Sequence, residues 1–244
     1  MARRDDRLGG AEPVLTVTRV AATGSTNADL LMLAGRGEAG EGDWLIAEQQ
    51  TAGRGRLGRP WQSPVGNLYA STLVKVTSET APALLALAAA VALAEAIPEP
   101  VSLKWPNDVL ADGAKLAGIL LERQGEWVVV GFGVNIASAP ALPDRRTIGL
   151  AEHHNGLVTV DSMFAALEER FLAWVAKWRA GQGEQLVQAW ERMGHARGDE
   201  LSVRLPDEAV IDGRYDGLEP DGALRLRLRS GETRVIHAGD VALI

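Results

Sequence analysis

Residues 53–61 read Gly-Arg-Gly-Arg-Leu-Gly-Arg-Pro-Trp, and this run constrains the fold more than any other part of the chain. Glycine reaches backbone conformations with positive φ that other residues avoid, so the run is typical of a flexible loop. The flanking segments favour strands, over Asp43–Gln50 before the run and Leu68–Val76 after it. The sequence therefore predicts a strand, a loop and a second strand in that order.

This loop has the composition of an anion site. Its glycines let backbone N–H groups approach an anion closely, and its arginines offer forked donors that match phosphate oxygens. Trp61 offers a flat face on which adenine could stack. The run matches neither a Walker loop nor a Gly-x-Gly-x-x-Gly turn that opens a helix. It predicts a loop that closes over a nucleotide phosphate.

Charge and composition narrow the choice of ligand and compartment. The 244 residues carry a net charge of −7, which disfavours a general nucleic-acid binder and favours a small anionic ligand. The chain has no cysteine, which excludes a disulfide scaffold and a thiolate nucleophile and fits the cytoplasm. The longest apolar run, Ala81–Ile97, contains Pro82 and Glu95 and is too short for a membrane span. We expect a cytoplasmic protein without a membrane segment.

Hydrophobic patterning predicts strands and helices between a disordered tail (residues 1–12) and a C-terminal β region. Further strands are predicted over residues 14–20, 101–105, 115–122 and 127–136. A helix is predicted from the N-cap candidate Ser25 through Ala34. Further helices are predicted over residues 82–96, from Asp161 onward, and over residues 183–193. The helix from Asp161 has an apolar stripe that predicts a core face: Phe164, Leu167, Phe171, Trp174, Val175 and Trp178.

After Gly198 the pattern changes to short strands. Turns are predicted at Asp212-Gly213, Asp216-Gly217, Asp221-Gly222 and Ser230-Gly231. Leucines alternate with arginines over residues 224–229, which predicts a strand with one buried face. We expect a small β-barrel that packs on the main domain.

Four further segments, one before the loop in the sequence and three after it, carry polar groups. They are Ser25-Thr26-Asn27, Lys104-Trp-Pro-Asn-Asp108, Lys115-Leu-Ala-Gly-Ile-Leu120 and Gly131-Phe-Gly-Val-Asn135, and Glu48-Gln-Gln-Thr-Ala52 precedes the loop itself. Together with Gly-Arg-Gly-Arg-x-Gly-Arg they closely resemble the biotin protein ligases, from about Val14 to the C-terminus.

The resemblance implies an α+β fold, with a mixed sheet packed by helices over residues 13–195 and an SH3-like barrel over 196–244. It implies two steps: biotin and Mg-ATP give biotinyl-5′-AMP, and a lysine of a biotin carboxyl carrier protein then receives biotin. The partner is thus the carrier domain of a biotin-dependent carboxylase such as acetyl-CoA carboxylase. Only about a dozen residues precede the first strand, so we expect no helix-turn-helix and no operator DNA binding. Members of the family dimerise through sheet edges, and the sequence does not decide whether this chain forms a homodimer.

The resemblance also implies roles for individual residues. Biotin-binding positions are Ser25, Thr26, Asn27, Gln50, Gly53, Arg54, Arg56, Lys115, Gly118 and Gly131. ATP-binding positions are Arg54, Arg56, Arg59, Trp61, Lys104, Asn107, Asp108, Lys115 and Asn135. Catalytic positions are Lys115, Arg54, Arg56 and Asp108, with Asp108 also a candidate Mg²⁺ ligand.

Several of these positions have a purely structural interpretation as well. Ser25 can be a helix N-cap, Trp61 a core residue, Asp108 a turn residue and Lys115 a solvated lysine at a strand edge. Asp108 is one candidate for the general base of the second step, and simple positioning of the acceptor amine is the other. His153-His154 does not predict a metal site, because adjacent side chains point in different directions.

Two other functions are compatible with parts of the sequence. A lipoate or octanoyl transfer enzyme would share the catalytic fold, but the arginine–glycine loop and Lys-Trp-Pro-Asn-Asp favour biotin. A non-enzymatic nucleic-acid module would use the loop on phosphates and the small barrel on single strands. The acidic net charge is unfavourable for that module.

Overall fold

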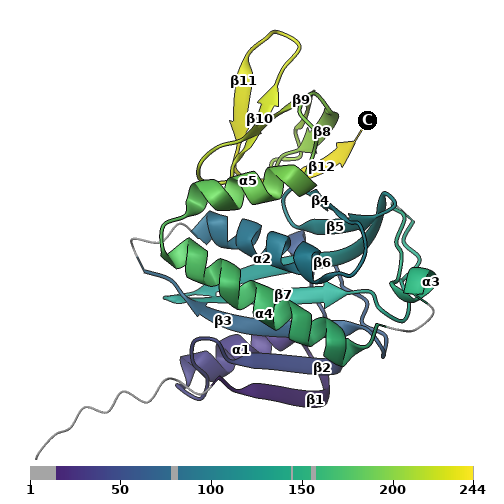
Figure 1. Ribbon diagram of the computed structural model, residues 1–244, viewed down its shortest axis with the longest axis vertical. Helices are drawn as coiled ribbons and strands as arrows, with labels where there is room; N and C mark the ends of the chain where they lie inside the picture. The colour runs from purple at the N-terminus through teal and green to yellow at the C-terminus, as the bar shows by residue number, and fades with distance from the viewer. Residues whose placement is uncertain (1–14, 78–81, 144, 155–157, 244) are drawn as a thin grey trace, which may run out of the picture.

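The computed structural model describes residues 15–77, 82–143, 145–154 and 158–243, and these residues form two sheets (Figure 1). The larger sheet has the strand order β1-β2-β3-β7-β6-β5-β4. Its strands are β1 (Val17–Thr23), β2 (Trp44–Gln50), β3 (Leu68–Lys75), β4 (Ser102–Lys104), β5 (Asp108–Ala111), β6 (Ala114–Gln124) and β7 (Trp127–Val134). β1 and β2 pair parallel and the other neighbours antiparallel, which confirms the mixed sheet.

The two faces of this sheet bury separate apolar clusters. Side chains alternate between the faces along a strand, so Trp44 and Ile46 enter the large core while Leu45 packs with Leu30. Figure 1 shows the helices on either side of the sheet. Helices α2 (Pro82–Ala96), α4 (Val160–Arg179) and α5 (Gly183–Met193) cover the large core, and α1 (Thr26–Gly35) covers the small one.

The aromatic stripe of α4 packs in the core, as predicted. Phe164 and Phe171 contact Trp44 edge-on, with ring centroids 5.2 and 5.8 Å from it. The helix begins one residue earlier than predicted, because Thr159 and Ser162 form a capping box that satisfies its first backbone donors. Three elements were missed: β5, the short helix α3 (Ala151–His154) and the 3₁₀ turn η1 (Arg56–Gly58) in the loop. β5 is only four residues long, too short for a clear pattern, and Asp108 at its start had been considered only as a possible turn residue.

The C-terminal residues form a five-stranded antiparallel sheet in the order β11-β10-β9-β8-β12. Its strands are β8 (Glu200–Arg204), β9 (Val210–Leu218), β10 (Leu224–Arg227), β11 (Thr233–Ile236) and β12 (Asp240–Leu243). The pairing confirms the predicted C-terminal β unit as an antiparallel sheet; no pairing between described residues joins β11 to β12, so its closure into an SH3-like barrel stays a prediction. The predicted disordered tail lies outside the described residues.

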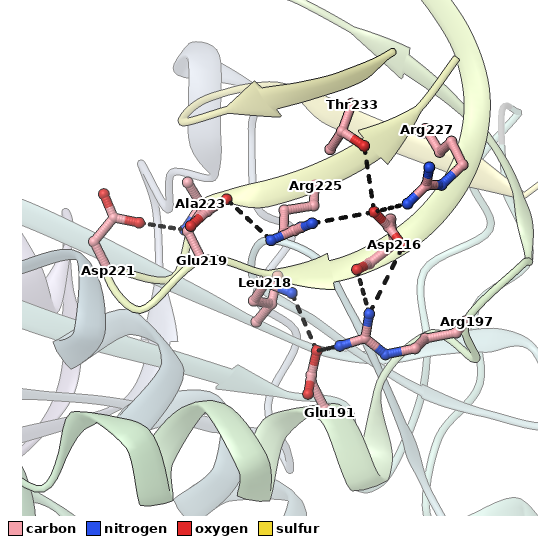
Figure 2. Close-up of polar contacts among 10 residues, drawn as sticks. All are labelled: Glu191, Arg197, Asp216, Leu218, Glu219, Asp221, Ala223, Arg225, Arg227 and Thr233. Carbon is pink, nitrogen blue, oxygen red and sulfur yellow. Dashed lines mark hydrogen bonds and ion pairs between the residues drawn. The ribbon is translucent and has the colours of Figure 1, made fainter. Parts of the chain in front are cut away.

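Two of the four predicted turns are wrong, because Asp212-Gly213 and Asp216-Gly217 lie within β9. Asp216 is instead the centre of a polar cluster (Figure 2), in which its carboxylate accepts from Arg227 at 2.8 Å and from Arg225 at 3.3 Å. Partial burial opposes ionisation of Asp216, but the hydrogen bonds and charges of these arginines together hold its pKa below the usual range. Gly217 has φ of 106° where the β9–β10 register shifts, which is typical of a β-bulge.

One continuous core connects the two sheets, because Leu201, Tyr215 and Leu224 belong to the same apolar cluster as α2 and α4. Trp105 joins them by hydrogen bonds: its indole Nε1 donates to Gly222 O at 3.2 Å. Its backbone N–H donates to Nε2 of buried His195 at 3.3 Å. None of the helices in the described part of the chain is long and apolar enough to cross a membrane.

His195 gives this junction a pH dependence. Burial lowers its pKa from 6.5 to about 4; the charge of Asp199 opposes the shift and that of Lys104 adds to it. Between these values the unfolded chain binds a proton that the folded chain does not. We expect unfolding free energy to be highest above pH 6.5 and to fall by about 3 kcal/mol as the pH approaches 4. Chemical denaturation at pH 7 and 4.5 measures this.

The control for that experiment is His195→Gln, which keeps an acceptor for the Trp105 N–H without titrating. The variant should be less stable at pH 7 and should lose less stability on acidification. An equally steep loss in the variant would show that other groups cause the pH dependence.

Candidate active site

A cavity of about 740 Å³ lies where the larger sheet, the N-terminus of α1, loop 53–61 and the β8–β12 pair meet. It collects residues that are up to about two hundred positions apart in sequence. The predicted site residues that line it are Ser25, Thr26, Asn27, Gln50, Arg54, Arg56, Arg59, Trp61, Lys104, Asn107, Asp108, Lys115, Gly118, Gly131 and Asn135. Gly53 is not among the lining residues and lies at the base of the loop, where its carbonyl accepts from Trp61 N–H at 2.9 Å.

The N-terminus of α1 contributes a polar wall to the cavity. Ser25 is the N-cap and accepts from Ala28 N–H, so it serves the helix and lines the cavity at once. The backbone N–H and hydroxyl of Thr26 both donate to Gln50 Oε1, at 2.9 and 3.1 Å. Gln50 in turn donates to Ser63, which fixes the end of β2 relative to the loop.

Gly131 allows Asn27 to lie directly on the sheet. A Cβ at Gly131 would be 2.2 Å from Asn27 Oδ1, so only glycine leaves room for this amide. Strand register places Ser71 and Leu120 on either side of Gly131. Ser71 donates to Asn27 Oδ1 at 2.7 Å, and Asn27 donates to Leu120 O and, at 2.8 Å, to Glu122. The amide is therefore held in one orientation.

Trp61 lies inside the cavity against two further glycines. A Cβ at Gly133 or Gly118 would be 2.6 or 3.1 Å from its ring, and Lys115 Nζ lies 5.3 Å from the ring centroid. Its indole N–H is buried and has no hydrogen-bond partner among the described residues. The same holds for Oδ1 of Asn135, whose amide nitrogen donates to backbone carbonyls. Both atoms belong to cavity-lining residues but are themselves closed to solvent, so a ligand contacts them only if these side chains move.

Loop 53–61 is a narrow hairpin whose arginines are each paired with an acid. Arg54 pairs with Glu122 at 3.1 Å. Arg56 pairs with Asp240 at 3.4 Å, and Arg59 contacts the same carboxylate. Burial lowers the pKa of Arg56, while the charges of Asp240 and Asp108 oppose that shift. The C-terminal sheet therefore holds the loop over the cavity through a residue of β12.

Three cations surround Asp108 at the opposite wall. Lys115 Nζ binds its Oδ1 at 2.6 Å, while Lys104 Nζ and Arg145 lie 3.9 and 4.0 Å from its Oδ2. Burial lowers the pKa of Lys104; Asp108 opposes this and the charges of Arg145 and Lys115 add to it. Lys115 is mostly buried, which disagrees with the interpretation of a solvated strand-edge lysine.

Magnesium is the metal that the resemblance implies, and the protein groups alone do not fit it. Mg²⁺ prefers carboxylates and phosphates together with water. Asp108 offers one carboxylate with three cations within 4.0 Å, which would repel a divalent cation. The described residues contain no group of three or more potential His, Cys, Asp or Glu ligands.

Sequence reasoning missed several polar residues of this site, among them Ser71, Glu122, Arg145, Arg204 and Asp240. Asp240 lies 184 positions from Arg56, and no local pattern predicts such a contact. The tandem Arg145-Arg146 shortly after Asn135 was a usable signal, because two adjacent arginines follow an otherwise apolar segment.

Comparisons with known proteins agree with this geometry. Residues 23–135 match the biotin/lipoate A/B protein ligase family and residues 200–243 match the biotin protein ligase C-terminal domain. The biotin–[acetyl-CoA-carboxylase] ligase of Mycobacterium tuberculosis is 36% identical, over 98% of this chain and 92% of the relative. The enzyme of that name from Paracoccus denitrificans is also 36% identical, over 91% of this chain and 98% of the relative.

A solved structure is similar over nearly the whole chain. The biotin protein ligase of Aquifex aeolicus, in complex with biotin and ATP, superimposes with a TM-score of 0.79 at 27% identity. The similarity covers 94% of this chain and 98% of that one. With the sequence matches, the shared fold and the cavity built from the five characteristic segments, this chain belongs to the biotin protein ligase family.

Proposed function

We propose that this chain joins biotin to a lysine of a biotin carboxyl carrier domain, using ATP. In the first step a carboxylate oxygen of biotin attacks the α-phosphorus of ATP, the bond to the β-phosphate oxygen breaks, and pyrophosphate leaves. In the second step the lysine amine of the carrier attacks the carbonyl carbon of biotinyl-5′-AMP, loses a proton and releases AMP. The carrier domain of acetyl-CoA carboxylase is the expected acceptor, as in the relatives' names.

The observation that carries this proposal is the excess of cations around one cavity in an acidic protein. Among described residues the cavity is lined by two acids, Asp108 and Asp240, and by these basic residues: Arg54, Arg56, Arg59, Lys104, Lys115, Arg145 and Arg204. Phosphoryl transfer concentrates negative charge on phosphate oxygens, and pre-oriented cations in a site shielded from water stabilise that charge. Lys115 is the central cation, since it lies between Asp108 and Trp61.

Two parts of the cavity suit two parts of the intermediate. The hydrogen-bonded wall of Thr26, Asn27 and Gln50 suits the polar ureido ring of biotin. Trp61 and Asn135 have the unmatched donor and acceptor and suit the adenine side. Trp61 lies on the floor of the cavity in the structure, so covering adenine requires its ring to move.

Magnesium belongs to this proposal as part of the Mg-ATP substrate rather than as a resident ion; the predicted role of Asp108 as its ligand is untested, and the three cations around Asp108 are unfavourable for that role. The cytoplasmic location and the lack of operator binding also stay predictions, and a homodimer formed through a sheet edge stays open. The boundary between the catalytic and C-terminal domains at residues 195–196 is likewise proposed, with the shared core around Trp105 joining the two parts.

The first test is exchange of labelled pyrophosphate into ATP with biotin, with lipoate and with neither. We expect exchange that requires biotin and falls about 10²- to 10³-fold in Lys115→Ala, because a central charge-stabilising donor is lost. Lys75→Ala is the matched control, since Lys75 is half-exposed on β3 and is not among the cavity-lining residues. Exchange with lipoate alone would assign the chain to the lipoate ligases.

Asp108→Asn separates positioning from base catalysis. Asp108 holds Lys115 at 2.6 Å, so we expect the variant to slow both adenylation and transfer from supplied biotinyl-5′-AMP, by up to about a hundredfold. Single-turnover rates of each half-reaction measure this. A loss confined to transfer would identify Asp108 as the general base and contradict a positioning role.

Gly131→Ala tests the Asn27 wall. The added methyl would displace the Asn27 amide and break its bonds to Ser71 and Leu120, so we expect the Kd for biotin to rise about tenfold or more. Gly35→Ala in α1 is the control, because nothing lies within 4 Å of its Cβ position. Calorimetric titration of both variants with biotin measures the difference. Unchanged affinity in Gly131→Ala would place biotin elsewhere.

A further inference from the structure

Glu122 is an acid of β6 that lies beside the cavity and that the sequence motifs do not include. Strand register places Leu120 opposite Gly131, and Glu122 is two positions further along the same strand. Because side chains alternate along a strand, Leu120 and Glu122 extend from the same face of the sheet. Asn27 lies on this face, in the space that Gly131 leaves open, so the Glu122 carboxylate can reach it.

The two oxygens of this carboxylate contact two different parts of the site. Oε2 accepts a hydrogen bond from the Asn27 amide at 2.8 Å, and Oε1 pairs with Nη2 of Arg54 at 3.1 Å. Asn27 belongs to the polar wall at the N-terminus of α1, whereas Arg54 belongs to loop 53–61. One side chain therefore bridges the wall and the loop.

The Asn27 end of this bridge has a fixed orientation. Its amide nitrogen donates to Leu120 O and to Glu122, and its Oδ1 accepts from Ser71 at 2.7 Å. A reversed amide would place Oδ1 against a carbonyl and a carboxylate, which are both acceptors. The orientation of Asn27 therefore depends in part on Glu122.

The loop is held at two points by two different sheets. Glu122 of the larger sheet holds Arg54, and Asp240 of the C-terminal sheet holds Arg56 and Arg59. Loss of the Glu122 contact would leave the Asp240 contacts in place. The effect of Glu122 can therefore be measured while the loop is still attached at its other end.

We propose that Glu122 is a positioning residue that couples biotin binding at the polar wall to the position of loop 53–61. This inference rests on the proposed function, which places biotin at that wall. A carboxylate has two acceptor oxygens, one for each partner. A glutamine has one acceptor oxygen, and its NH₂ group would face the N–H donors of the guanidinium. Glutamine at this position can therefore serve Asn27 or Arg54, but not both.

The experiment measures the Kd for biotin by calorimetric titration of Glu122→Gln, in the unaltered chain and in an Arg54→Ala background. We expect the Kd to rise about tenfold in the unaltered chain, because one charge-assisted contact is lost. With Arg54 already removed, the glutamine oxygen is free to turn to Asn27. The same change should then raise the Kd by less than about twofold.

Glu126→Gln is the matched control. Glu126 is 55% exposed, pairs with Lys75 at 3.1 Å and is not among the cavity-lining residues. This variant removes the same charge without touching the wall or the loop, so the Kd should not change. Digestion of the ligand-free chain with trypsin gives a second measurement. Cleavage within residues 53–61 should be faster in Glu122→Gln and unaltered in Glu126→Gln, because a loop with one contact fewer opens more often.

An equal rise of the Kd in both backgrounds would overturn the inference, because Glu122 would then act without Arg54. An unchanged Kd or an unchanged rate of loop cleavage in Glu122→Gln would also overturn it. Thermal unfolding identifies misfolding. If Glu122→Gln misfolds, Glu122→Asp decides by the same comparison, because it keeps the charge but is too short to span both partners. Absence of biotin binding in the unaltered chain would overturn the proposed function itself.

Discussion

The cavity depends on three glycines in two paired strands, because these positions carry no side chain. Gly118 on β6 and Gly131 and Gly133 on β7 leave backbone exposed where the rest of the sheet carries side chains. Asn27 and Trp61 lie in the space so created, within 3.1 Å of where Cβ atoms would be. Because antiparallel register fixes which residues flank each glycine, the hydrogen bonds of Asn27 follow from the sheet itself.

Charge compensation then explains how a cationic site can exist without its ligand. Arg54 is balanced by Glu122, and Arg56 and Arg59 by Asp240. A charge withdrawn from water needs a partner, and these acids occupy the role that phosphate oxygens would take. Phosphate binding to the loop must therefore compete with the protein's own carboxylates. The affinity for nucleotide therefore depends on how much more stable the arginine–phosphate contacts are than the arginine–carboxylate contacts they replace. The number of arginines alone does not set it.

Local pattern predicted most of the longer elements but not the contacts between them. The strongly periodic helix α4 and the cap at Ser25 were predicted because each depends on residues within one or two turns. The turns at Asp212 and Asp216 were wrong because both residues lie in β9: Asp212 pairs with Ser202 of β8, and the carboxylate of Asp216 faces arginines of β10, which are tertiary features. Likewise, the motifs predicted which residues meet, whereas Asp240 and Glu122 are supplied by distant strands that carry no recognisable motif.

The C-terminal sheet is part of the site as well as of the core. Asp240 on β12 contacts two loop arginines, and Arg56 also donates to Gly239 O and Asn107. On the other side of the same segment, Trp105 is anchored to Gly222 and His195. The strand that carries Lys104 and the loop that carries Arg56 are thus both tied to the C-terminal sheet. A ligand that drew Arg56 away from Asp240 would break one of the contacts that attach this sheet to the loop.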